Sequence, residues 1–248
     1  MANLEKICKK IRQQILKTSY EVKACHIGSA LSCVEILVVL YWKILKRNDI
    51  FIFSKASGAS ALYSVLAEKG YFEKDKLAYY LKNYPLASKE VPGVIHSVGS
   101  LGHGLSVAVG MALANKKRRV YCLVSDAEVQ EGTFWESLLF ASHHKLDNLK
   151  IIIDYNKIQA CGNIKEILNL ESLSLKLQSF NWLVSEIAGH NLDKLEWTLK
   201  IPSIKNMPHI IIAHTVKGRG VSFMENDYLW HYRNLDDDKL LELALNNL

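Results

Sequence analysis

Two oxygen-bearing side chains, Asp126 and Asn156, stand thirty positions apart, and each follows an apolar run. VYCLV and then Ser125 precede Asp126, while IIIDY precedes Asn156. A carboxylate and an amide oxygen are hard donors, which suit Mg²⁺ or Ca²⁺ and not zinc. Mg²⁺ usually completes its shell with water and phosphate oxygens, so the pair indicates a metal that anchors a phosphorylated molecule. A helix cap at Asp126 and a turn at Asn156 are the alternative interpretation.

The elements that must position this pair alternate along the chain. Apolar runs predict strands at 51–53, 119–125, 149–155, 181–187 and 208–215. Helical periodicity predicts helices at 3–20, 31–45, 61–72, 74–82, 105–116, 129–145 and 235–248, with a glycine-rich loop at 92–104. Alternation predicts an α/β fold, a doubly wound, mainly parallel sheet with helices on both faces, and residues 1–248 as a single domain. Ligands of such sheets bind outside the carboxyl ends of the strands, where adjacent strands would bring both side chains together.

Composition narrows the class of protein. The 49% hydrophobic and 23% charged content is that of an ordinary globular domain. We see no apolar run that would span a bilayer and no signal-peptide pattern, so we expect a cytoplasmic protein without a membrane partner. Five widely spaced cysteines without a CxxC argue against a zinc ribbon and for reduced thiols.

The net charge of +6 raises the question of an anionic partner. The densest basic cluster, Lys116 to Arg119, falls between a predicted helix and a predicted strand, where a solvated turn is the simple interpretation. We therefore expect no nucleic-acid binding. An anionic small molecule or an acidic partner surface explains the charge equally well.

The segments around the polar pair resemble a known cofactor motif. SDAEVQEG followed by DYNKIQACG is similar to the motif of thiamine-diphosphate enzymes, in which GDG is followed by Asn after about thirty residues. Residues 26–37, 54–72, 91–114, 134–149 and 215–226 resemble, in order, the amino-terminal half of transketolases, most closely the split form with separate chains. The resemblance implies a diphosphate-binding subunit of an enzyme that transfers a two-carbon ketol unit from a ketose to an aldose.

The resemblance also implies roles for individual residues. The metal ligands would be the side chains of Asp126 and Asn156 and the carbonyl of Ile158, and the catalytic histidines would be His26 and His231. The residues expected to contact thiamine diphosphate are Ser57, Gly99, Ser100, Leu101, Ser125, Asp126, Ala127, Asn156, Ile158 and His231. Glu131 and Glu136 are expected at a subunit interface.

Part of the family's machinery has no counterpart in this chain. The glutamate that contacts the pyrimidine ring of the cofactor, and most of the arginines that bind sugar phosphates, belong to the other half in this family. The resemblance therefore implies an obligate carboxy-terminal transketolase subunit, in an α₂β₂ assembly, and a small-molecule sugar substrate.

Several positions depart from the family pattern. Ser125 and Ala127 replace the two glycines of GDG, and a left-handed φ at Ala127 would be costly. Ser57 and Tyr84 stand where the family usually has histidines. These changes indicate either an enzyme for an unusual substrate, such as a carrier-linked or modified sugar or a 2-oxo acid, or a degraded paralogue that serves as a cofactor-binding scaffold.

The retained motif residues favour an active enzyme over a degraded one. They are Asp126, Glu131, Asn156, His26 and His231. A dehydrogenase is a further alternative, but the glycines of residues 99–104 are spaced GxxGxG, whereas dinucleotide binding requires GxGxxG directly after a strand.

Overall fold

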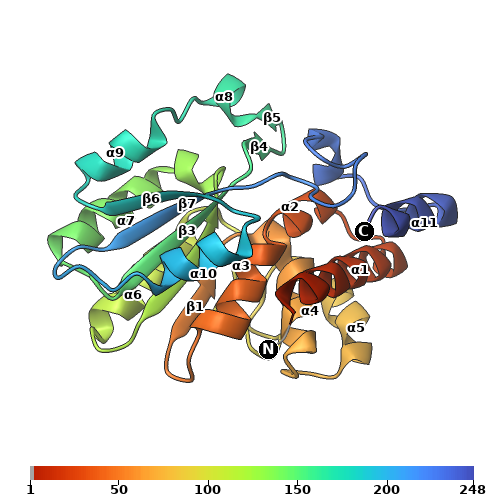
Figure 1. Cartoon of the computed structure of the whole chain (residues 1–248), viewed down its shortest axis with the longest axis horizontal. Helices are drawn as coiled ribbons and strands as arrows, with labels where there is room; N and C mark the ends of the chain where they lie inside the picture. Colours follow the sequence, from red (N-terminus) through yellow and green to blue (C-terminus); the bar gives the residue numbers. More distant parts are fainter. Residues whose placement is uncertain (1–2) are drawn as a thin grey trace.

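The fold centres on one five-stranded parallel sheet. The computed structural model describes residues 3–248. The strands run in the order β1 (Ile50–Phe53), β2 (Val120–Ser125), β3 (Leu149–Tyr155), β7 (His209–His214) and β6 (Leu183–Ala188), and every neighbouring pair is parallel (Figure 1). The predicted α/β class and the parallel sheet are confirmed.

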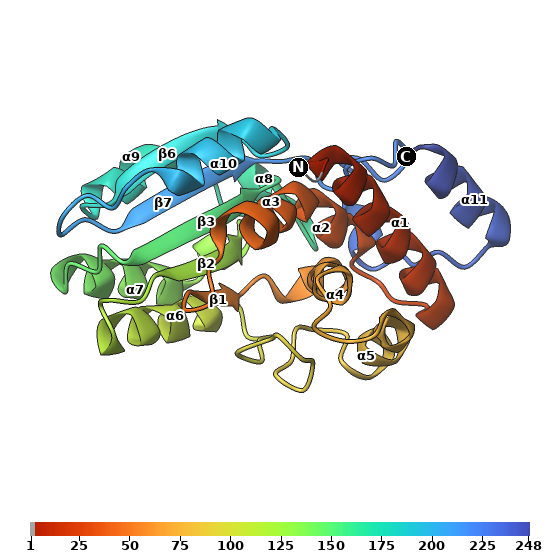
Figure 2. The same cartoon turned by 60° about the horizontal axis from the view of Figure 1, so that its bottom comes forward.

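Helices cover both faces of the sheet because its strands are apolar on both sides. Along β3, Ile151 and Ile153 pack against α6 (His103–Ala114) and α7 (Gly132–His143), whereas Ile152 points to the opposite face. That face is covered by α3 (Val34–Val39) and α10 (Leu192–Lys200), and α1 (Leu4–Val22) packs against α3 (Figure 2). Successive strand side chains point to opposite faces, so the near-continuous apolar runs supply two cores.

The remaining elements lie mostly around the carboxyl edge of the sheet. They are α2 (Ile27–Ser32), α4 (Ala59–Glu68), α5 (Leu77–Asn83), the hairpin of β4 (Ile158–Gln159) and β5 (Gly162–Asn163), α8 (Ile164–Ile167) and α11 (Asp238–Asn246). By contrast, α9 (Leu173–Ser179) packs against β6. Short 3₁₀ turns occupy Ala56–Gly58, Lys74–Lys76, Glu128–Gln130 and Tyr228–His231. Within residues 3–248, no helix combines the length and apolarity needed to cross a bilayer.

Several predicted helices differ from the observed ones, three of them near the strand ends. The single helix expected at 31–45 is α2 and α3, interrupted at Cys33 with φ −102° and ψ 10°, and then a π-helical turn over Leu40–Ile44. The helix predicted at 61–72, with Gly70 as its C-cap, ends at Glu68, and the chain turns away at Gly70, whose φ is +78°. The third begins only at Gly132, because a 3₁₀ turn precedes it.

Candidate functional site

Asp126 and Asn156 meet at the carboxyl edge of the sheet. Strands β2 and β3 are adjacent and parallel, with Ser125 opposite Asp154. The segments that follow the two strands therefore leave the sheet side by side. Both side chains are buried. The backbone N–H of Lys157 donates to Oδ2 of Asp126 at 2.5 Å, which ties the end of one strand to the end of the other.

This edge has the oxygen donors that a cation requires. Burial, together with the neighbouring Asp154 carboxylate, raises the pKa of Asp126 to about 7. Among residues 3–248 no group of three or more His, Cys, Asp or Glu side chains could hold a metal. An ion here would therefore rely on Asp126, the amide of Asn156, the carbonyl of Ile158 and oxygens of a bound molecule. That donor set fits Mg²⁺.

A fully buried lysine links these donors to a histidine. The Lys217 ammonium donates to the carbonyls of Ile158 (3.1 Å) and Gln159 (3.3 Å) and to Nδ1 of His231 (3.1 Å). Burial and the positive charge of Lys55 lower the pKa of Lys217 to about 8. The arrangement is suited to an anion, because two ammonium groups are held out of water near the strand ends.

The second buried lysine, Lys55, follows β1 and is held by a carboxylate from β3. Its Nζ lies 3.3 Å from Oδ2 of Asp154, which also accepts a hydrogen bond from Ser32 Oγ at 2.6 Å. Thr215 Oγ1 donates to the other oxygen of Asp154. Burial alone would lower the pKa of Lys55, but the Asp154 carboxylate reverses the effect and raises it. Asp154 thus keeps Lys55 charged and fixed.

The two predicted catalytic histidines lie in contact. The backbone N–H of His26 donates to the backbone carbonyl of His231 at 2.9 Å. The two imidazole rings meet edge to face, with their centroids 4.8 Å apart. Burial and the charge of Lys217 lower the pKa of His231 to about 3, and burial and Lys55 lower that of His26. Both imidazoles are therefore neutral near pH 7. Since Nδ1 of His231 accepts from Lys217, the hydrogen of its ring sits on Nε2.

A buried glutamate, Glu128, connects three loops at this edge. Its carboxylate accepts from the N–H of Gly102 (3.2 Å), the N–H of Ser125 (2.8 Å) and the hydroxyls of Ser125 and Ser54. Burial outweighs these bonds and raises the pKa of Glu128. The loop it anchors carries three exposed residues predicted to contact the cofactor, Gly99, Ser100 and Leu101.

Glycine is required where that loop enters α6. Gly102 has φ +82°, and a Cβ there would lie 2.2 Å from Oγ1 of Thr133. The helix accordingly begins at His103, two residues before its predicted start.

Neither departure beside Asp126 strains the backbone. Ala127 adopts φ −64° and ψ −34°, so it does not need the left-handed conformation that would have been costly. Its N–H donates to Oδ1 of Asp126 at 3.0 Å. The Ser125 hydroxyl finds its partner in Glu128. Both replacements of glycine are structurally compatible with the site.

Other predicted residues are not joined to this hydrogen-bonded group. Ser57 lies on the 3₁₀ turn after Lys55, and its side chain has no hydrogen bond within the part of the chain that the structure describes. Tyr84 is half-buried at the end of α5. Glu131 and Glu136 are exposed at the start of α7.

Sequence reasoning did not identify Lys55, Lys217, Asp154 and Glu128 as site residues. A signal was present for the lysines, because each follows an apolar strand at the edge where ligands bind. The roles of Asp154 and Glu128 depend on contacts between distant segments and have no local signature.

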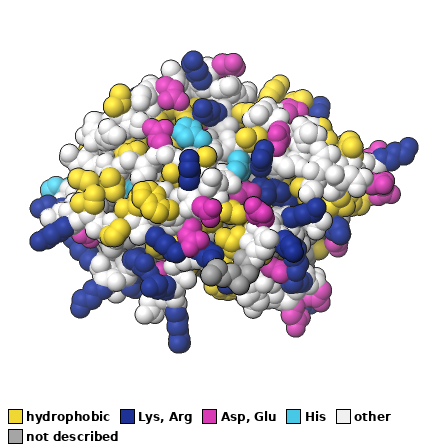
Figure 3. Space-filling view, in the orientation of Figure 1, with side chains coloured by type: hydrophobic (Ala, Val, Ile, Leu, Met, Phe, Trp, Pro, Cys, Tyr) yellow, Lys and Arg dark blue, Asp and Glu magenta, His cyan; other side chains and the backbone are white. Residues whose placement is uncertain are grey.

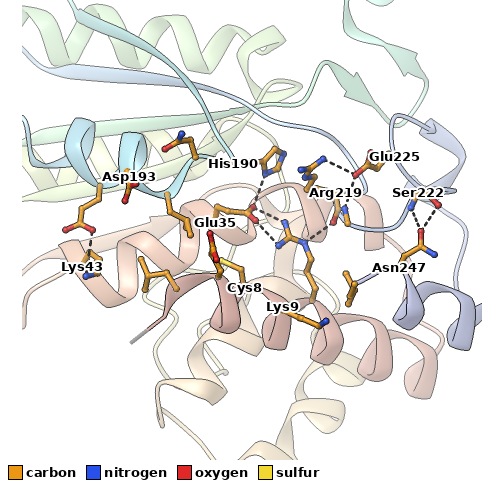
Figure 4. Close-up of a pocket in the computed structure, with 18 residues that line it drawn as sticks. Cys8, Lys9, Glu35, Lys43, His190, Asp193, Arg219, Ser222, Glu225 and Asn247 are labelled. Carbon is orange, nitrogen blue, oxygen red and sulfur yellow. Dashed lines mark hydrogen bonds and ion pairs between the residues drawn. The ribbon is translucent and has the colours of Figure 1, made fainter. Parts of the chain in front are cut away.

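A large cavity lies beside this site and not in it. It has a volume of about 850 Å³ and lies between α1, α3, the start of α10 and the segment after β7 (Figure 4). Its wall carries the buried pair Arg12 and Glu35, 2.8 Å apart, with His190 Nδ1 2.9 Å from Glu35. None of the predicted cofactor, metal or catalytic residues lines it.

Comparison with known proteins points to one family. The family described as "Transketolase, thiamine diphosphate binding domain" matches residues 4–245. A subunit of the apulose-4-phosphate transketolase of Actinobacillus succinogenes is 41% identical over 99% of this chain and 95% of its own. The 6-deoxy-6-sulfo-D-fructose transketolase subunit SqwG of Clostridium sp. strain MSTE9 is 34% identical, over 92% and 90% respectively.

Solved structures show the same fold. A transketolase from Leishmania mexicana superposes with a TM-score of 0.87 at 23% identity, covering 98% of this chain and 44% of that one. A transketolase from Campylobacter jejuni gives a TM-score of 0.84 at 24% identity, covering 97% and 41%. The chain thus spans less than half the length of these solved structures.

Proposed function

Because the chain belongs to the transketolase family of thiamine-diphosphate-binding domains, we propose that it is the amino-terminal subunit of a two-component transketolase. In this proposal residues 1–248 form one diphosphate-binding domain of a cytoplasmic enzyme. The enzyme transfers a two-carbon ketol unit from a ketose donor to an aldose acceptor. The observation that carries the proposal is the group formed at the carboxyl edge by the buried Asp126 and Lys217 and by the half-buried His231, which Lys217 contacts.

The strand-end residues divide the work of holding the cofactor. Asp126, Asn156 and the Ile158 carbonyl would hold Mg²⁺, and Lys55 and Lys217 would neutralise the diphosphate. Thiamine diphosphate supplies the carbanion chemistry when bound. The buried lysines suit this task, because they are already desolvated and need not shed water when the anion arrives.

The histidine pair is placed to handle protons of a sugar substrate. Both imidazoles are neutral, so each offers one donor and one acceptor nitrogen. Lys217 occupies Nδ1 of His231, which leaves Nε2–H to donate. His26 packs against this ring and would orient a substrate hydroxyl or take up its proton.

The remaining half of the active site would come from a partner. Two of the relatives described above are named as subunits, which supports a partner subunit. In this proposal the partner is a carboxy-terminal transketolase subunit that brings the pyrimidine-contacting glutamate, in an α₂β₂ assembly. Exposed apolar side chains on α7, Leu139 at 59% and Phe140 at 45% exposure, lie on the same helix as Glu136. This combination supports an interface role for Glu131 and Glu136.

The substrate is proposed to be a modified or phosphorylated sugar. The two relatives described above are named after apulose 4-phosphate and 6-deoxy-6-sulfo-D-fructose, and both molecules are anionic sugars. The replacements Ser57 and Tyr84 at positions usually held by histidine fit a donor other than the common ketose phosphates.

Calorimetry tests the proposal. Thiamine diphosphate with Mg²⁺ is titrated into the chain alone and into the chain mixed with its candidate partner. We expect cofactor binding that tightens with the partner, and ketol transfer only from the mixture. Absence of cofactor binding in both cases would refute the proposal that the chain is an enzyme subunit. Binding without transfer to any sugar acceptor would leave a cofactor-binding scaffold.

A further inference from the structure

A second polar pocket lies at the opposite, amino-terminal edge of the sheet. It has a volume of about 230 Å³ and lies between the end of α10, the turn after α3 and the first residues of β2 and β3. We call it the amino-edge pocket; its polar lining includes Lys43, Lys46, Arg119, Lys150, Lys200 and Ser203. Five of its eleven lining residues are basic and none is acidic, so its chemistry is that of an anion site.

Lys150 is the buried centre of this pocket. The residue is only 6% exposed, and its ammonium donates to the carbonyls of Leu199 (2.9 Å) and Ile201 (2.5 Å) at the end of α10. An ammonium has three hydrogens to donate. These two carbonyls are the partners that the described residues provide, so one hydrogen is left for a group in the pocket that Lys150 lines.

The acids near the pocket balance only part of its positive charge. Glu196 pairs with Lys200 and lies 3.9 Å from Lys43, and Asp49 pairs with Arg119 at 3.0 Å. Five cations therefore face two carboxylates, a surplus of three positive charges.

Lys46 and Lys150 account for most of that surplus. Among residues 3–248 neither has an acidic side chain within salt-bridge distance. Burial and the charge of Arg119 lower the pKa of Lys150 to about 8. A buried cation without a counter-ion is unfavourable, and a bound anion would remove that cost.

The wider surface concentrates positive charge on the same side. Figure 3 shows Lys and Arg side chains gathering at the lower left, over the loops that precede β1 and β2. These loops carry Lys46 and the run from Lys116 to Arg119. A surface of this kind raises the local concentration of small anions near the pocket mouth.

We propose that the amino-edge pocket binds a phosphate-type anion, either free inorganic phosphate or the phosphoryl group of a small metabolite. Lys150 would donate from the pocket floor, and Lys46 and Arg119 would donate from its rim. The site is separate from the proposed cofactor site. Lys150 opens β3 and Asn156 follows its end, so six residues, or about 20 Å of strand, separate them. The inference does not depend on the proposed function.

Isothermal titration of the chain with inorganic phosphate, at constant ionic strength, tests the proposal. Lys46→Gln is expected to weaken binding at least about tenfold, as for the loss of a hydrogen bond to a charged group. Lys150→Met is expected to weaken it further. Lys117→Gln removes the same charge from the surrounding surface, outside the pocket, and should weaken binding by much less than Lys46→Gln does. Ribose 5-phosphate forms the second arm, and tighter binding than phosphate would identify a phosphorylated metabolite as the ligand.

A Lys217→Met variant separates the two anion sites. Phosphate binding that persists in this variant but weakens in Lys46→Gln supports the amino-edge pocket. Binding that is lost in Lys217→Met and retained in both pocket variants would overturn the proposal, because it would place the phosphate at the strand ends. Equal weakening by Lys117→Gln, or binding of heparin without binding of phosphate, would also overturn it and indicate a diffuse polyanion surface. Since Lys46 is exposed, its variant remains informative if Lys150→Met unfolds.

Discussion

The Lys217 ammonium lies 3.1 Å from Nδ1 of His231 and donates to it, which joins the oxygen donors of the strand ends to the histidine pair. The same ammonium donates to the carbonyl of Ile158. A change in charge at the proposed diphosphate site would therefore reach the predicted catalytic histidine through one side chain. This coupling predicts a measurable effect on the ring of His231.

Lys217→Met should raise the pKa of His231 above its value of about 3. Burial would still hold the pKa low, but the repulsion from the adjacent ammonium would be gone. Nδ1 would also lose its donor, so the ring would no longer be confined to the Nε2–H tautomer. Nitrogen-detected NMR of the histidine rings reads both quantities. A Lys117→Met variant is the matched control, and an unchanged His231 spectrum in Lys217→Met would contradict the coupling.

Asp126→Asn should abolish Mg²⁺-dependent binding of thiamine diphosphate while the chain stays folded. The substitution keeps the size of the side chain but removes the negative charge that a metal requires. We expect a loss of more than about a hundredfold in affinity, since even outer partners of metal ligands are worth 10- to 100-fold. Calorimetry measures the affinity and circular dichroism the fold. Asp236→Asn, at an exposed position, is the control. Affinity equal to that of the unaltered chain would rule out Asp126 as a ligand.

The sequence was sufficient to locate this aspartate but not its surroundings. Apolar runs ending in Asp126 and Asn156 already predict adjacent strand ends, and the structure places them so. Lys217 and Thr215 follow β7, which pairs with β3 although some fifty residues separate the two strands. The order of the strands depends on packing over the whole sheet. No local sequence pattern therefore predicts that Thr215 donates a hydrogen bond to Asp154. Contacts of this kind account for what sequence reasoning missed at the site.

Glu128→Ala should loosen the loop at residues 99–102. The substitution leaves the N–H groups of Gly102 and Ser125 without their buried acceptor. Each unsatisfied buried donor costs about 1–3 kcal/mol, so the free energy of unfolding should fall by at least about 2 kcal/mol. For a chain of this size that is a drop in Tm of about 4–8 °C.

Hydrogen exchange distinguishes this effect from general destabilisation. The amides of Gly102 and Ser125 should exchange faster in Glu128→Ala under native conditions, whereas core amides such as that of Ile152 should change only with global stability. Glu136→Ala on the exposed side of α7 serves as the control. Unchanged protection at Gly102 and Ser125 would show that Glu128 does not hold the loop.

The Glu35 network should make the fold sensitive to acid. Burial raises the pKa of Glu35, but the hydrogen bond from His190 and the charge of Arg12 outweigh it and lower the pKa to about 2. A carboxyl whose pKa is lower in the folded chain stabilises the fold fully above its unfolded value near 4.5. That stabilisation, of the order of 3 kcal/mol, disappears as the pH falls from about 4.5 to 2.

Urea unfolding at pH 7 and at pH 3 measures this loss. Glu35→Gln should be less stable than the unaltered chain at pH 7, because Arg12 and His190 lose their buried partner. The difference in the free energy of unfolding between the two proteins should shrink at pH 3, because Glu35 is then largely protonated in the unfolded chain but still charged in the folded one. The rest of this difference should vanish near pH 2, where Glu35 is protonated in the folded chain as well. Glu242→Gln, at an exposed site, should follow the unaltered chain at every pH. A stability difference that stays constant between pH 7 and pH 2 would show that Glu35 stabilises the fold through its packing and not through its charge.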